Sequence, residues 1–126
     1  MDSPDPKTGP AVGMTIKERS VDALTTVVEL EGELDLYAAA ELNASLTHAV
    51  DEQCRRLVVD VRGVTRIDFS LIAIIVQTGR VLGQRHGTME VVCADDEIGR
   101  MLARAGERGR FEVTVAPDGD GDRPED

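Results

Sequence analysis

The sequence predicts an α/β domain whose mixed sheet of four to five strands begins with an antiparallel hairpin and packs against about three helices. Strand-like apolar runs alternate along the chain with segments of helical periodicity, the order typical of a sheet covered by helices. Two strand-like segments, 14–19 and 25–30, come first and lie a turn apart, so we expect them to pair antiparallel. A helical segment separates each later pair of strands, which favours parallel pairing.

After the hairpin we expect helices and strands in strict alternation: a helix over 38–50, a strand over 57–61, a helix over 70–85, a strand over 89–93, a helix over 98–105 and a strand over 110–115. The run at 57–61 is interrupted only by Asp60, the pattern of a strand covered on both faces, and we take Gly63 to end it. Gly106 is the expected stop of the last helix.

The run that follows Asp68 is ambiguous in its composition. Its β-branched residues favour a strand, whereas Asp68 and Ser70 before an apolar run are helix-start signals, because a side-chain oxygen can accept from a free backbone N–H. Length decides for a helix that begins at Ser70, since the segment continues through Arg85 and is too long for an ordinary strand.

Composition limits both the size of the domain and its partners. The chain has 126 residues, 41% of them hydrophobic and only three aromatic, so we expect one domain over 14–116 with an aliphatic core. We expect a disordered lead over 1–13 and an acidic disordered tail over 117–126. A formal charge of −10 with so few aromatic residues argues against nucleic acid as a partner, because nucleic-acid binders need cationic and stacking side chains.

Several other classes of site lack sequence support. The longest apolar run, 71–76, is too short to cross a bilayer and no targeting pattern opens the chain, so we expect a cytoplasmic protein without a membrane partner. Cys54 and Cys93 lack metal or redox spacing and indicate free thiols rather than a zinc site. No Gly-rich phosphate loop follows an expected strand, so we expect no cofactor.

One alternative function is a small enzyme that uses Asp60 and Asp68 as paired acids. Without a placed His or metal ligands, acids at strand ends are more often structural hydrogen-bond acceptors. His48 and His86 have no Ser or Cys at a recognisable spacing, and we expect both on the surface.

Three segments, in this order, resemble the STAS domain family of anti-sigma-factor antagonists. They are 31–36 (EGELDL), 57–68 (LVVDVRGVTRID) and the end of the domain at 105–113, with its Ala-Gly and Phe-Glu-Val. The resemblance covers about residues 14–115 and implies the STAS fold. It also implies a protein that regulates transcription by stoichiometric partner switching and is not an enzyme.

The resemblance further implies the partners and the site. Unphosphorylated, such a domain binds an anti-sigma factor that is itself a serine kinase; phosphorylation of a serine breaks the complex, and a serine phosphatase resets it. That serine falls on Ser70, and ATP would bind the partner kinase. Monomer or weak homodimer is the expected state. The expected contact surface consists of Asp35, Asp68, Phe69, Leu71 and Ile72.

Elementary electrostatics is compatible with this switch. The amino end of a helix favours an anion, so a phosphate on Ser70 leaves the fold intact. It also adds about −2 of charge beside Phe69 and Leu71, which disfavours an apolar contact there. Arg62 and Arg66 lie close in sequence and are candidates to hold the phosphate.

Two departures from the family pattern leave alternatives open. Phe69 stands where the family usually has a small hydroxyl residue, and Leu71 stands where it usually has glycine. Ser70 is therefore either a phospho-acceptor or only a helix cap, and in the second case the protein is an unswitched interaction or scaffolding module. Asp35 is likewise either part of the partner surface or a helix cap.

Overall fold

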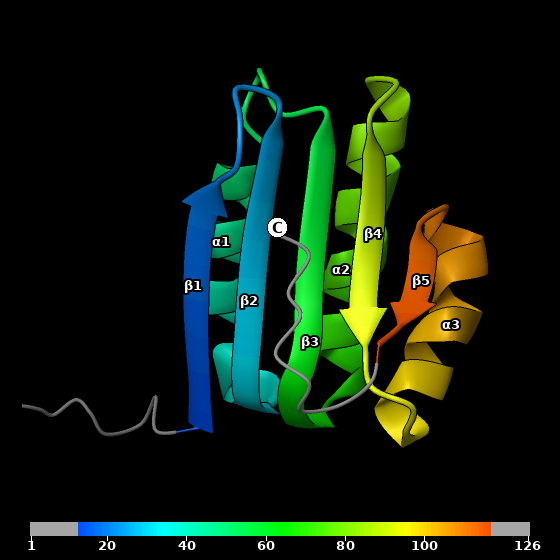
Figure 1. The fold of residues 1–126 in the computed structure, drawn as a ribbon. Coiled ribbons are helices and arrows are strands. Elements are labelled where there is room, and N and C mark those ends of the chain that lie inside the picture. The colour runs from blue at the N-terminus through cyan, green and yellow to red at the C-terminus, as the bar shows by residue number, and fades with distance from the viewer. Residues whose placement is uncertain (1–12, 117–126) are drawn as a thin grey trace, which may run out of the picture.

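The computed structural model describes residues 13–116, which form a five-stranded sheet and three α-helices (Figure 1). The elements are β1 (Met14–Ser20), β2 (Thr25–Leu34), the short 3₁₀ helix η3 (Leu36–Ala38), α1 (Ala39–Ala49), β3 (Arg56–Ile67), α2 (Phe69–Gln84), β4 (Thr88–Cys93), α3 (Glu97–Gly109) and β5 (Glu112–Val115). The predicted fold class is confirmed. The predicted tail and all of the predicted lead except Gly13 lie outside the described residues.

The strands follow one another across the sheet in chain order, β1-β2-β3-β4-β5. Only the β1–β2 pair is antiparallel, and the other three pairs are parallel. Because each crossover adds the next strand on the same side, right-handed connections bring α1, α2 and α3 onto one face (Figure 1). No helix of the described chain covers the other face.

The core between the helices and the sheet is aliphatic, as the composition predicted. Leu71, Ile75 and Leu82 of α2 are fully buried, and α2 contacts both neighbouring helices. Phe111 is the only buried aromatic side chain among residues 13–116. No helix in this range is long and apolar enough to span a membrane.

The prediction that Gly63 ends the central strand is wrong. β3 continues to Ile67 and pairs with β2 as far as Leu34, across register shifts that begin after Glu29. Gly63 is the register partner of Glu31, and a Cβ at Gly63 would lie 2.8 Å from Glu31 Cγ. The glycine therefore lets the two strands stay paired rather than ending one of them.

Gly106 does not end α3 either. The helix continues to Gly109, and Arg110 follows as its C-cap with a φ of 58°, in the left-handed region. A Cβ at Gly106 would lie 2.9 Å from the carbonyl oxygen of Phe111, so this glycine allows the helix to pack against the chain that enters β5.

Replacing glycine by alanine should have opposite effects on stability at two positions of α2. A Cβ at Gly79 would lie 2.7 Å from the carbonyl oxygen of Gly109, whereas a Cβ at Gly83 would meet no atom within 4 Å. We expect Gly79→Ala to lower the free energy of unfolding by about 1–3 kcal/mol through overpacking. Gly83→Ala should raise it by about 0.5–1 kcal/mol, because alanine is the better helix former. Urea unfolding followed by circular dichroism tests both, and equal effects would contradict the packing described here.

Candidate functional site

The candidate site lies at the edge where the parallel strands β2, β3 and β4 end. Each of these strands is followed by an aspartate that caps the next helical segment. Asp35 accepts a hydrogen bond from the Tyr37 N–H (3.0 Å), Asp68 from the Ser70 N–H (2.9 Å) and Asp96 from the Gly99 N–H (2.9 Å). Sites in parallel sheets characteristically form at this edge.

Strand pairing brings two of these caps together. Leu34 and Ile67 are register partners, and Asp35 and Asp68 follow them directly. The backbone N–H of Asp68 also donates to the carbonyl oxygen of Leu34 at 2.9 Å. Because paired strands lie about 4.8 Å apart, the first turns of η3 and α2 are neighbours, and the two segments contact each other.

Ser70 lies in the first turn of α2 and is half-buried. Its hydroxyl donates to Asp68 Oδ1 at 2.8 Å, and the same carboxylate oxygen accepts from its backbone N–H. These two hydrogen bonds, the backbone one first, hold the pKa of Asp68 below its usual value. The N-cap of α2 is therefore Asp68, and the interpretation of Ser70 as the cap is wrong.

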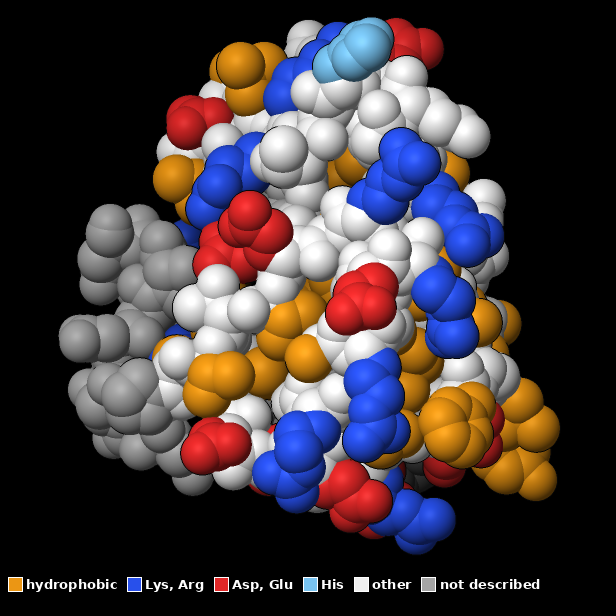
Figure 2. Space-filling view, turned by 90° about the vertical axis from the view of Figure 1, so that its right-hand side faces the viewer, with side chains coloured by type: hydrophobic (Ala, Val, Ile, Leu, Met, Phe, Trp, Pro, Cys, Tyr) orange, Lys and Arg blue, Asp and Glu red, His pale blue; other side chains and the backbone are white. Residues whose placement is uncertain are grey.

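Three large hydrophobic side chains are exposed at this edge, and we call them the apolar patch. Leu36 is 62% exposed, Tyr37 94% and Phe69 77%. In Figure 2, hydrophobic side chains project from the lower right, at the end of the molecule where α2 begins. Exposed aromatic side chains of this size are typical anchors of protein interfaces.

Leu71 and Ile72 do not belong to this surface. Their side chains are 0% and 4% exposed and pack in the core beneath α2. The prediction that they contact a partner is corrected, because a side chain with no accessible area offers none to a partner in this conformation. Phe69, Asp68 and Asp35 are exposed, as a contact surface requires.

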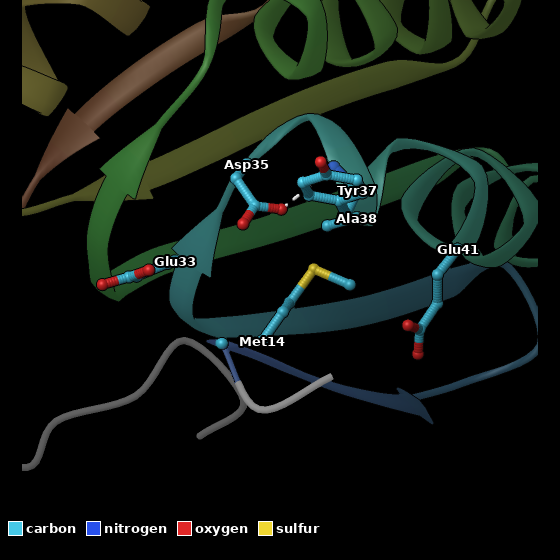
Figure 3. A pocket seen from close by; sticks show the side chains of 7 residues that line it. Met14, Glu33, Asp35, Tyr37, Ala38 and Glu41 are labelled. Carbon is cyan, nitrogen blue, oxygen red and sulfur yellow. Dashed lines mark hydrogen bonds between the residues drawn. The ribbon is translucent and has the colours of Figure 1, made fainter. Parts of the chain in front are cut away.

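A surface pocket of about 350 Å³ adjoins the apolar patch (Figure 3). Three acidic residues, Glu33, Asp35 and Glu41, line it together with Met14, Tyr37 and Ala38, and Gly13 completes the lining. Figure 3 shows Glu33 and Glu41 on opposite sides of Met14, with Asp35 and Tyr37 above it at the start of η3. The pocket extends the edge into an acidic surface.

Comparison with known proteins identifies the family. The family described as "Mlab, STAS domain" matches residues 19–111. The chain belongs to the STAS domain family.

Three solved structures share its fold. An anti-sigma factor antagonist from Mycobacterium paratuberculosis is 23% identical over 86% of this chain and 90% of its own, with a TM-score of 0.72. The anti-sigma factor antagonist SpoIIAA in its unphosphorylated form is 16% identical over 80% and 89%, with a TM-score of 0.66. The Bacillus cell fate determinant SpoIIAA in the phosphorylated form is 17% identical over 80% and 92%, with a TM-score of 0.65.

The paired-acid alternative fails on geometry in this STAS domain. Asp60 is 2% exposed, and its carboxylate accepts three hydrogen bonds from Arg62, at 3.0–3.1 Å. Asp60 lies within β3 and Asp68 after its end, more than about 20 Å apart along an extended strand. Arg62 is correspondingly bound to Asp60 and its side chain is 8% exposed, so it does not hold a phosphate on Ser70.

The remaining polar candidates of the STAS domain are structural. Cys54 and Cys93 are buried free thiols, and burial raises the pKa of each, which disfavours the reactive thiolate. His48 is exposed and lies 3.1 Å from a Glu18 carboxylate oxygen. Within residues 13–116, no three His, Cys, Asp or Glu side chains are grouped so that they could hold a metal ion.

Sequence reasoning missed Leu36 and Tyr37, which are 62% and 94% exposed at the edge, beside the predicted Phe69 at 77%. A signal was present, since Tyr37 is one of only three aromatic residues and lies directly before a helix. Local pattern does not tell an exposed aromatic from a buried one, because that depends on how η3 is placed against α2.

The Asp68 cap predicts a specific pH dependence of stability. Because the folded-state pKa of Asp68 is lowered, its carboxylate stabilises the fold above the unfolded-state pKa, and this stabilisation is lost as pH falls through the folded-state value. Asp68→Asn keeps a good capping side chain but does not titrate. We therefore expect the difference in unfolding free energy between wild type and Asp68→Asn to be constant near neutral pH and to shrink below about pH 4.

Denaturant titrations over this pH range test the expectation. Asp95→Asn is the matched control, because Asp95 is also an exposed aspartate shortly before a helix, α3, but caps no helix. A difference for Asp68→Asn that stays unchanged down to about pH 3 would contradict the cap's contribution.

Proposed function

We propose that this STAS domain is an anti-sigma-factor antagonist that binds an anti-sigma factor with serine kinase activity and is released when Ser70 is phosphorylated. The observation that carries the proposal is the place of the Ser70 hydroxyl, in the first turn of α2, next in sequence to exposed Phe69. The shared fold with SpoIIAA, whose structure is known in unphosphorylated and phosphorylated forms, supports it. The protein is the kinase's substrate rather than an enzyme, and a serine phosphatase restores the binding form.

Phosphorylation changes the charge at the edge without removing what holds the fold. The Ser70 hydroxyl now donates to Asp68, and a phosphate ester lacks that hydrogen. The ester brings about −2 of charge next to the Asp68 carboxylate, with Asp35 directly after the end of the neighbouring strand β2. Repulsion turns the phosphate and its water toward solvent beside the apolar patch, which opposes an apolar contact.

The fold itself tolerates this change. The Ser70 backbone N–H still donates to Asp68, and Leu71 and Ile75 below it remain buried. An anion at the first turn of a helix is also favoured by the helix dipole. Phosphorylation therefore alters the surface and leaves the scaffold in place, as partner switching requires.

The switch is tested by affinity capture from the native lysate with wild type, Ser70→Ala and Ser70→Asp. We expect wild type and Ser70→Ala to capture a kinase-type ATPase that Ser70→Asp does not, because only the aspartate adds charge at the edge. Incubating the captured kinase and ATP with the domain should place a phosphate on Ser70 of wild type only, as seen by mass spectrometry.

Ser20→Asp is the control for charge alone, because Ser20 is exposed at the end of β1, away from the carboxyl edge. It should capture the same partners as wild type. If Ser70→Asp also does so, the switch is wrong and the protein is an unswitched interaction or scaffolding module.

The apolar patch gives a second prediction about the same interface. We expect Tyr37→Ala and Phe69→Ala each to weaken binding of the captured partner about tenfold or more, since aromatic anchors dominate interface energy. Neither should lower the unfolding free energy appreciably, because both side chains are exposed. Titration calorimetry measures the binding.

Leu24→Ala serves as the control for exposed apolar surface. Leu24 is 53% exposed but lies beside the β1–β2 turn, at the other end of the sheet. Wild-type affinity in both Tyr37→Ala and Phe69→Ala would place the contact surface elsewhere.

A further inference from the structure

A second surface feature lies at the other end of α2 from Ser70. A groove of about 410 Å³ is lined there by Arg80, Gly83, Gln84, Arg108 and Arg110, and we call it the arginine groove. It is about 20 Å along the helix from Ser70. We propose that the arginine groove binds a carboxylate-rich segment of a partner protein.

The groove is positively charged, although the chain as a whole is acidic. The chain has a formal charge of −10, yet every charged residue that lines the groove is an arginine. Among the described residues, no carboxylate lies within ion-pair distance of Arg80, Arg108 or Arg110. Figure 2 looks onto the α3 side of the molecule, and basic side chains lie next to one another in its upper right part. Guanidinium groups bind carboxylates through paired, parallel hydrogen bonds.

Arg80 is held so that part of its guanidinium stays available. Its Nε donates to the carbonyl oxygen of Arg108 at 3.3 Å. This bond holds the Arg80 side chain, on α2, against the end of α3. The terminal amino groups are not used by this bond. The helix dipole explains a cation at the carboxyl end of α3, but it does not explain the other features of the groove.

Gly83 is the feature that internal packing leaves unexplained. Gly79, one turn earlier, is required because a Cβ would meet Gly109, whereas a Cβ at Gly83 would meet nothing. An exposed glycine inside a helix lowers helix stability relative to alanine. Because Gly83 lines the groove, its missing side chain leaves room for another chain to approach closely.

Arg110 is the second unexpected residue. It adopts φ 58° at the end of α3, a position that glycine fills at much lower conformational cost. An arginine held in this conformation places a third guanidinium at the groove. The left-handed turn is itself a common way to end a helix, so what is unexpected here is arginine in the place of glycine.

A short acidic peptide fits this groove better than a nucleic acid. A net charge of −10 repels a long polyanion, whereas a short segment interacts mainly with the arginines within a Debye length of about 8 Å. The exposed aromatic side chains that could stack on bases, Tyr37 and Phe69, lie at the opposite end of α2.

The probe for the test is a fluorescein-labelled peptide of about ten glutamates, titrated with the full chain near physiological salt and followed by anisotropy. We expect saturable binding to wild type. Arg80→Gln, Arg108→Gln and Arg110→Gln should each weaken it about three- to fivefold, the loss expected for one exposed ion pair, and the triple variant should abolish it. Arg100→Gln is the matched control, because Arg100 is exposed on α3 about 12 Å from Arg108 and should leave binding unchanged.

Gly83→Leu separates a seated segment from diffuse attraction. It keeps the charge and fills the groove, so we expect it to abolish binding, while Gly83→Ala confirms that a side chain here leaves the fold intact. Wild-type binding by Gly83→Leu, or no binding by wild type, would overturn the proposal.

Two further binding measurements decide which molecule or segment occupies the arginine groove. Tighter binding of a labelled single-stranded oligonucleotide than of the peptide would overturn the choice of an acidic peptide. Tighter peptide binding by a full chain with Asp118, Asp120 and Asp122 changed to Asn would make the chain's own carboxyl-terminal segment the occupant instead of a partner. Ser70→Asp should bind the peptide like wild type, so failure here leaves the phosphorylation switch unaffected.

Discussion

The pairing of β2 with β3 beyond the register shifts is the constraint on which the candidate site depends. It carries the two strands to Leu34 and Ile67, so that Asp35 and Asp68 begin neighbouring helical segments at one edge. The Asp68 N–H bonded to Leu34 then fixes the start of α2 against β2. Had the strands ended at residues 30 and 61, these carboxylates would lie on unconnected loops.

Apolar periodicity was sufficient to predict the order and type of the elements, but two boundaries placed at glycines were wrong. The sequence predicts that Gly63 ends a strand and Gly106 ends a helix, because glycine tends to break both kinds of element. In the structure, Gly63 leaves room for the side chain of Glu31, which is distant in sequence. Gly106 leaves room for Phe111, which lies beyond the end of α3. That information is not local, so a pattern along the chain does not contain it.

The sequence was sufficient to predict several residues of the candidate site, but not which of their side chains face the solvent. Asp35, Asp68, Phe69 and Ser70 do lie at one edge, because the pairing of Leu34 with Ile67 brings the starts of η3 and α2 together. The inward turn of Leu71 and Ile72 depends on which residue caps α2, since each helical residue rotates by about 100°. Two candidate caps two residues apart therefore predict opposite faces, and only the hydrogen bonds of Asp68 decide between them.

The two ends of α2 have opposite electrostatic requirements. At its amino end the dipole itself favours an anion, so a phosphate on Ser70 needs no arginine to be compatible with the fold. At its carboxyl end the dipole disfavours an anion, so an acidic ligand needs cationic side chains, and three arginines line the groove there. Between the two ends lies a buried core that includes Leu71, Ile75 and Leu82. Coupling between two sites requires two states that both ligands bias, and neither proposed binding event needs this core to repack, so the two proposals together predict independent binding at the two ends of α2.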